Sequence, residues 1–333
     1  MVVFAAIIAA GLLGMVVYIL YSALKDGWYL LMHNLGLQKL FIKSADIERI
    51  TQYLHNFSYF THLLPEGKKK FVSRLLTFML NKEFVGGAGL IVTEEMRVLI
   101  SASAIQLTFG LGKYKLESLE TIVIFPDTFF LHKRSPEYKG ATKGRKMFLS
   151  WKSFQEGYAQ SDDNLNLGLH EMTHALKLTL NLGKRYDKLF ADRMDYWENL
   201  INEKFSGDRQ NFAFLRTYAN ANTEEFFAAC VEAFFESPDK FEKELPEIFQ
   251  LLTFLLNQNI KNKLDDYKLD KTHFENNKYN IPLPKEVKRS YKYSTNHWSI
   301  FLLIIGCIGA FPTFFFLMNY FMLPYIGYFL MLF

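Results

Sequence analysis

The sequence predicts an α+β fold, mostly helical with a small sheet, flanked by a transmembrane helix at each end. Three observations support this prediction: both ends are long apolar segments without charges, the middle has mixed polarity, and two short β-rich runs lie there among helical patterns. We expect four parts: an N-terminal transmembrane anchor at 1–33, a folded domain at 34–260, a polar linker at 261–297 and a C-terminal transmembrane segment at 298–333.

The N-terminal segment is long enough to cross a bilayer. Val2 to Leu24 contains no charged residue, and about 20 apolar residues span the hydrocarbon core as a helix. A cleaved signal peptide is the alternative interpretation, but it requires a basic region before the apolar run, and this sequence has none. We therefore expect a retained anchor.

The C-terminal apolar stretch, Trp298 to Phe333, has no charged residue and is too long for one ordinary crossing. Pro312, Pro324 and Asn319 are candidates for a bend, so we expect one spanning helix followed by an interfacial, re-entrant or hairpin segment. Lysines follow the first span and precede the last one. By the positive-inside rule, this pattern predicts that the domain between the spans is cytoplasmic. The spans themselves imply a lipid bilayer as partner.

The charge balance and the cysteines agree with this setting. The net charge is +4 and part of the excess lies beside the predicted spans, so the composition does not indicate nucleic-acid binding. Cys230 falls in a predicted domain helix and Cys307 in a predicted span, which argues against a disulfide between them.

The first half of the domain contains a glycine cluster and the two β-rich runs. Gly86, Gly87 and Gly89 predict a bend before a helix capped by Thr93, because no G-K-[ST] ending of a phosphate loop follows them. The runs 121–126 and 146–151 predict strands joined by a polar loop, and the pattern turns helical after the second run.

The stretch "LNLGLHEMTHALKL" contains the motif H-E-x-x-H on a helix entered after the second strand. His170 and His174 lie one turn apart on one face, so both imidazoles can reach the same Zn²⁺ ion. Glu171 between them can take the proton of a zinc-activated water and pass it to a leaving amine. The motif therefore predicts hydrolysis at a metal site.

A catalytic zinc site needs a third protein ligand and an open position. The helical pattern after Thr223 offers Glu225, with Ala228 and Ala229 on the same face to allow a close approach to the histidine helix. Glu232, two turns further on, is a candidate to orient one histidine through its other ring nitrogen. Glu224 is the alternative ligand, but it points about 100° away.

Tyr218, upstream of Glu225, is a candidate for stabilising an oxyanion. Several ordered blocks then resemble the Mlc titration factor A family of zinc-dependent peptidases over residues 63–259: "KEFVGGAGLIVTEEMRVLISASAIQLTFGLG", "ETIVIFPDTF", "LSWKSFQEGY", "NLGLHEMTH" and "YANANTEEFFAACVEAFFESP". The resemblance implies His170, His174 and Glu225 as zinc ligands, Glu171 as general base and Tyr218 as oxyanion helper.

The resemblance also implies a zincin-like fold similar to the catalytic domain of anthrax lethal factor, aminopeptidase-like activity and binding of the repressor Mlc. Lys177 departs from the pattern, because the family commonly has aspartate there. Members of the family are known as soluble proteins, so membrane segments would be an addition in this chain.

These observations favour a membrane-anchored zinc metallopeptidase acting on a peptide or protein, with 146–151 as an edge strand that pairs with the extended substrate. Intramembrane proteolysis is disfavoured because Asp162, Asp163 and Lys177 surround the motif and indicate a water-exposed domain. The alternative from another class is a zinc-containing binding module that captures a transcriptional regulator at the membrane. Replacement of Glu171 distinguishes the two hypotheses.

Overall fold

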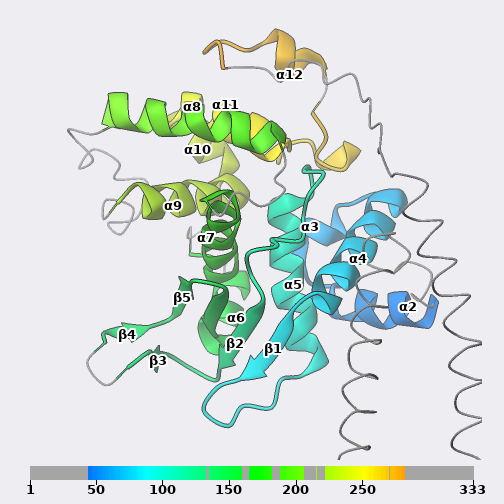
Figure 1. Ribbon diagram of the computed structural model, residues 1–333. Coiled ribbons are helices and arrows are strands. Elements are labelled where there is room, and N and C mark those ends of the chain that lie inside the picture. The colour runs from blue at the N-terminus through cyan, green and yellow to red at the C-terminus, as the bar shows by residue number, and fades with distance from the viewer. Residues whose placement is uncertain are drawn as a thin grey trace, which may run out of the picture. The chain divides into compact units, whose positions relative to one another are not determined.

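The domain is seen in a computed structural model that describes residues 44–132, 135–159, 165–181, 188–205, 215, 222–269 and 271–281 (Figure 1). The predicted membrane spans, within 1–33 and 298–333, lie outside these residues, and so does Tyr218. No helix in the described part of the chain combines the length and apolar character that a bilayer crossing requires.

Most of the described chain is helical, in agreement with the predicted α+β class. The helices are α2 (Ser44–Tyr53), α3 (Ser58–Thr61), α4 (Pro65–Leu80), α5 (Glu94–Thr108), α6 (Trp151–Ala159), α7 (Leu167–Asn181), α8 (Lys188–Phe205), α9 (Thr223–Glu236), α10 (Pro238–Glu244), α11 (Pro246–Leu256), the 3-10 helix η4 (Lys263–Asp265) and α12 (Lys271–Glu275). The strands are β1 (Glu83–Gly86), β2 (Thr121–Phe125), β3 (Phe129–Phe130), β4 (Glu137–Tyr138), β5 (Gly140–Lys143) and β6 (Lys146–Ser150).

The main sheet has the strand order β1-β2-β6-β5. The pairs β1–β2 and β2–β6 are parallel, whereas β5 is antiparallel to β6. The prediction of an edge strand at 146–151 is therefore wrong: β6 lies inside the sheet, and the edge strands among the described residues are β1 and β5. Alternate residues of the two inner strands are fully buried, namely Ile122, Ile124, Met147 and Leu149.

The predicted polar loop between the two β-rich runs instead forms three strands, β3, β4 and β5. Gly144 has φ of +58°, a value that glycine adopts without strain, and it opens a two-residue turn between β5 and β6. The short polar strand β5 has few β-branched or aromatic residues, so its sequence favours a loop and only the pairing with β6 makes it a strand.

The predictions around the glycine cluster are confirmed in part. Ala88 and Gly89 have φ of 49° and 79°, which makes the expected bend, and Thr93 caps α5 by accepting a hydrogen bond from the backbone of Met96. Gly86, however, is the last residue of β1, a strand that the sequence pattern does not predict. This strand forms because its backbone pairs with β2.

Helix α7, which bears the H-E-x-x-H motif, is the central helix of the domain. It packs against α5, α6 and α9 and against β5 and β6, so it lies between the sheet and α9 (Figure 1). Along the chain, helix α6 lies between β6 and α7, whereas the sequence predicted that α7 follows the strand more directly. In α9 every residue from Phe226 to Phe234 is buried, and the small side chains of Ala228 and Ala229 lie in this buried part.

The folded chain continues beyond residue 260. Tyr267 is buried and stacks on Tyr59 with a centroid separation of 4.2 Å, and Ile281 is also buried. Part of the stretch predicted as a polar linker therefore packs into the hydrophobic core. The division at 1–33, 34–260, 261–297 and 298–333 stays a prediction.

Candidate metal centre

Two histidines of α7 and one glutamate of α9 come together in the structure. One donor atom from each of His170, His174 and Glu225 lies within 4.8 Å of the others. The Nε2 atoms of the two histidines are 3.1 Å apart, and the carboxylate oxygens of Glu225 lie 3.1 Å from His170 Nε2 and 3.5 Å from His174 Nε2. Glu224, the alternative ligand, is outside this cluster.

Local sequence positions the start of both helices. Asn166 caps α7, because its side-chain oxygen accepts a hydrogen bond from the backbone N–H of Leu169. Asn222 caps α9 in the same way and accepts from the backbone N–H groups of Glu224 and Glu225. Glu225 therefore lies in the first turn of its helix, where the helix dipole favours a negative charge.

Glu232 is the buried partner of His170. Its Oε1 atom lies 2.7 Å from His170 Nδ1, and its Oε2 atom accepts a hydrogen bond from the backbone N–H of Asn166 at 2.7 Å. Glu236, one turn later, accepts from the side chain of Asn166 at 3.1 Å. These bonds join the start of α7 to α9 and turn His170 Nε2 toward the other two members of the cluster.

Glu171 is buried between α7 and the edge strand β5. Its Oε2 atom accepts a hydrogen bond of 2.8 Å from the hydroxyl of Thr142. Its Oε1 atom faces Gly140, where an added Cβ would lie only 2.5 Å away. The close approach of strand and carboxylate therefore depends on a glycine at position 140.

Carboxylates and imidazoles shift one another's pKa values in this site. Burial lowers the pKa of His170, but the carboxylates of Glu225 and Glu232 raise it to about 10. Burial raises the pKa of Glu225, but the two histidines lower it to about 2. For Glu171, burial raises the pKa and the histidines oppose this effect. Three carboxylates around two imidazoles make the site favourable for a cation.

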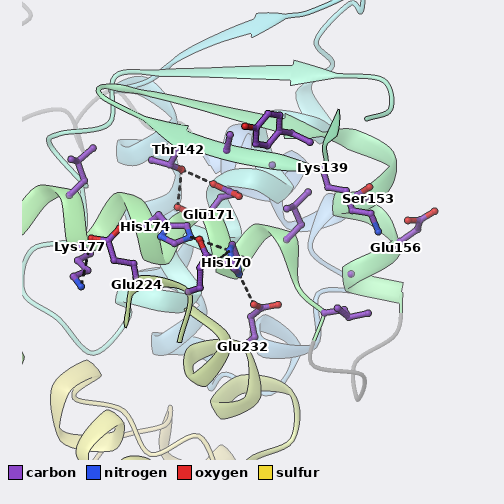
Figure 2. Close-up of a pocket in the computed structure, with 18 of the residues that line it drawn as sticks. Lys139, Thr142, Ser153, Glu156, His170, Glu171, His174, Lys177, Glu224 and Glu232 are labelled. Carbon is purple, nitrogen blue, oxygen red and sulfur yellow. Dashed lines mark hydrogen bonds and ion pairs between the residues drawn. The ribbon is translucent and has the colours of Figure 1, made fainter. Parts of the chain in front are cut away.

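The cluster opens into a cavity of about 960 Å³, a size that fits a peptide segment. Figure 2 shows that Thr142 and Glu171 line it beside the two histidines, with Lys139, Ser153 and Glu156 toward one end and Lys177 and Glu224 toward the other.

Lys177 is not the solvent-exposed residue that the sequence suggested. Its side chain is only 10% exposed, and its ammonium group lies 3.7 Å from Glu198 and 3.9 Å from Glu224. The position that departs from the family pattern thus lies inside the cavity. Its burial removes it as an argument for a water-exposed motif.

The donor set fits a zinc ion. Ligand atoms about 2.0–2.2 Å from a tetrahedral zinc ion lie roughly 3.3–3.6 Å from one another, close to the 3.1 Å and 3.5 Å separations between the Glu225 oxygens and the histidine nitrogens. Glu225 Oε2 is buried and, apart from its 3.1 Å approach to His170 Nε2, has no hydrogen-bond partner among the described residues, as expected for an oxygen that faces a cation. Glu232 holds the far nitrogen of His170, a common arrangement around metal-binding histidines.

Two contacts of this site were not predicted from the sequence. Thr142 lies in the stretch interpreted as a polar loop, and no motif pointed to it. Asn166 has a partial signal, since an asparagine directly before a helical pattern is a typical cap. Its bonds to α9 depend on tertiary packing and have no local signal.

A helix with H-E-x-x-H beside a sheet edge, joined by a glutamate from a second helix, defines a metallopeptidase site of the zincin kind. Residues 38–255 match the family described as glucose-regulated metallo-peptidase M90. The chain belongs to this family, which includes the Mlc titration factor A proteins.

The match between this chain and its relatives covers most of each relative's length. An uncharacterized protein of Synechocystis sp. is 24% identical over 58% of this chain and 78% of its own. Mlc titration factor A of Klebsiella pneumoniae is 23% identical over 57% of this chain and 78% of its own, and that of Yersinia pestis is 22% identical over 56% and 75%. The resemblance noted in the sequence is therefore confirmed for the family.

Replacing Glu232 with glutamine is expected to weaken zinc binding by about 10- to 100-fold. The two donors, His170 Nδ1–H and the Asn166 backbone N–H, use different oxygens of Glu232. In glutamine an NH2 group, which only donates, takes the place of one of these oxygens, so one of the two donors loses its acceptor. Zinc affinity can be measured by competition with a fluorescent chelator. Glu236→Gln on the same helix is the matched control, and equal losses in both variants would contradict a role for Glu232 in orienting His170.

Proposed function

We propose that this protein is a zinc-dependent peptidase that hydrolyses peptide bonds with Glu171 as general base. The main support is the convergence of His170, His174 and Glu225 in one cavity with the buried Glu171 carboxylate. These three residues would hold the ion and leave a fourth position open. When bound, a zinc ion in such a site acidifies water and polarises a carbonyl group.

Residues of the chain itself have the other roles in the proposed reaction. Glu171 accepts a proton from the attacking water and passes it to the leaving amine, a role suited to a carboxylate whose pKa is raised by burial. Glu232 keeps His170 in the tautomer that directs Nε2 toward the cluster. Tyr218, outside the described residues, is proposed from the family resemblance as the group that stabilises the oxyanion.

An extended substrate backbone is proposed to pair with the free edge of β5. This strand pairs with β6 on one side, and in the described chain no strand covers its other side. Residues 137–142 line the cavity, so a peptide added at this edge would pass over the metal cluster. Strand β5 thus replaces the stretch 146–151 as the proposed substrate strand.

Metal-dependent cleavage tests the proposal. The purified full-length chain should contain near one zinc per molecule and cleave a mixture of internally quenched peptides. Removal of the metal with 1,10-phenanthroline should abolish cleavage, and added Zn²⁺ should restore it. Peptides with blocked and free N-termini distinguish endopeptidase from the aminopeptidase activity that the resemblance implies. Full activity after metal removal would contradict the proposal.

A binding module is the second candidate, favoured by the name of the relatives, Mlc titration factor A. Such a module would capture a transcriptional regulator and keep its affinity when Glu171 is replaced.

Anchoring of a cytoplasmic domain to a membrane through 1–33 and 298–333 is a further proposal, supported by the apolar sequence of both segments. Carbonate extraction of membranes from expressing cells tests it, since an anchored chain stays in the pellet.

A further inference from the structure

We infer that Thr142 is a positioning residue that holds the carboxylate of Glu171 in its working orientation. The inference rests on the proposed role of Glu171 as general base. It assigns a function to β5 beyond substrate pairing, because the same strand would fix the base.

The contact is direct and selective. The Thr142 hydroxyl donates to Glu171 Oε2 at 2.8 Å and lies 3.4 Å from the Glu171 backbone oxygen. Within the described ranges, no other side chain donates a hydrogen bond to this carboxylate. Glu171 itself is only 4% exposed, so bulk water would be a poor substitute for the Thr142 hydroxyl if this donor were removed.

The same face of β5 contacts both oxygens of the carboxylate. Residues two apart on a strand point to the same side, and Gly140 and Thr142 both face Glu171. The hydroxyl holds Oε2, while the bare backbone at Gly140 leaves room for Oε1. The carboxylate is therefore placed by the strand on one side and by α7 on the other (Figure 2).

This arrangement couples the base to the substrate. The peptide would pair with the outer edge of β5, and the carboxylate is held by the face of β5 that bears Gly140 and Thr142. Because the same short strand binds both, the distance between peptide and carboxylate stays constant. Misplacement of a catalytic group by about 1 Å costs on the order of 100-fold in rate. Loss of the hydroxyl should therefore reduce turnover more than substrate binding.

The kinetic test compares two substitutions at one position. Thr142→Val keeps the shape but removes the hydroxyl, and kcat should fall about 10- to 100-fold, as for a lost hydrogen bond to a charged group, with KM within about twofold. Thr142→Ser restores the donor and should keep kcat within about threefold. Both variants should retain zinc, since the hydrogen bonds of the Thr142 hydroxyl go to Glu171 and not to the three proposed ligands.

The control is Thr121→Val in β2. The Thr121 hydroxyl also donates to a glutamate, Glu83 Oε2 at 3.2 Å, but on an exposed part of the sheet. This variant should leave kcat and KM unchanged. The inference is overturned if Thr142→Ser loses as much kcat as Thr142→Val, or if Thr142→Val changes KM alone.

A second measurement does not depend on activity. In the full chain as purified, Thr142→Val should increase the unfolding equilibrium constant about 10-fold or more, but by less than about twofold when Glu171 is already alanine. Equal increases in both backgrounds overturn the inference. A wild-type chain that cleaves no peptide would contradict the proposed function alone, and the unfolding cycle would still decide whether Thr142 holds Glu171.

Discussion

Replacing Glu171 with glutamine is expected to lower kcat by about 10²- to 10⁴-fold, the usual contribution of a general base. Glutamine preserves the size of the side chain and can still accept the hydrogen bond from Thr142, but its amide cannot take a proton from water. Glu171 is outside the cluster of His170, His174 and Glu225, so the zinc content should stay near that of the wild type. Steady-state cleavage of a quenched peptide and metal analysis of the same sample measure both quantities.

Glu83→Gln provides a matched control for this variant. Glu83 also accepts a hydrogen bond from a threonine hydroxyl, that of Thr121, at a distance from the cavity. Its kcat should equal that of the wild type. A Glu171→Gln variant that retains zinc and most of its kcat would show that another group is the base, whereas loss of zinc would show that Glu171 supports the metal site itself.

The same variant separates the two candidate functions. A peptidase loses turnover when Glu171 is replaced, even if it also binds a regulator. A module that only binds its partner should keep its affinity and has no turnover to lose. The two quantities therefore need to be measured on one preparation.

Replacing Glu225 with glutamine is expected to weaken zinc binding by more than the roughly 10- to 100-fold typical of a residue that only orients a ligand. The substitution removes the negative charge of a proposed ligand and leaves an amide facing the two histidines. After dialysis against a weak chelator, the zinc content should fall from near one per chain to a small fraction. Metal analysis by mass spectrometry measures this change directly.

Glu224→Gln is the companion variant, because Glu224 is the adjacent residue on α9 and the alternative ligand suggested by the sequence. Its side chain is 56% exposed, its carboxylate lies 3.9 Å from the ammonium group of Lys177, and it is outside the cluster. We expect this variant to keep its zinc. Zinc retained in Glu225→Gln and lost in Glu224→Gln would reverse the assignment.

Sequence periodicity was sufficient to predict the features that depend on a single helix or on a single β-rich run. A spacing of four residues puts His170 and His174 on one helix face whatever surrounds them. The preference for Glu225 over Glu224 followed from the helix period and from the small residues Ala228 and Ala229, and only Glu225 lies in the cluster. The strands β2 and β6 were visible as β-rich runs.

The order of the strands could not be predicted in this way. Strand β5 is short and polar, and it is a strand because the turn at Gly144 brings it beside β6. Its place at the sheet edge depends on which strands pair, and pairing joins segments that are distant in sequence. The prediction that β6 is the edge failed for this reason.

By itself, therefore, the sequence determined the chemical groups of this protein: two histidines and a glutamate on one helix, a second glutamate on another, and membership of a metallopeptidase family. Only the tertiary structure decided what surrounds them. Glu232 meets His170 across 62 residues of sequence, and Thr142 meets Glu171 across 29. Contacts of this kind depend on the packing of α7 between α9 and β5, and no local pattern records how separate elements pack.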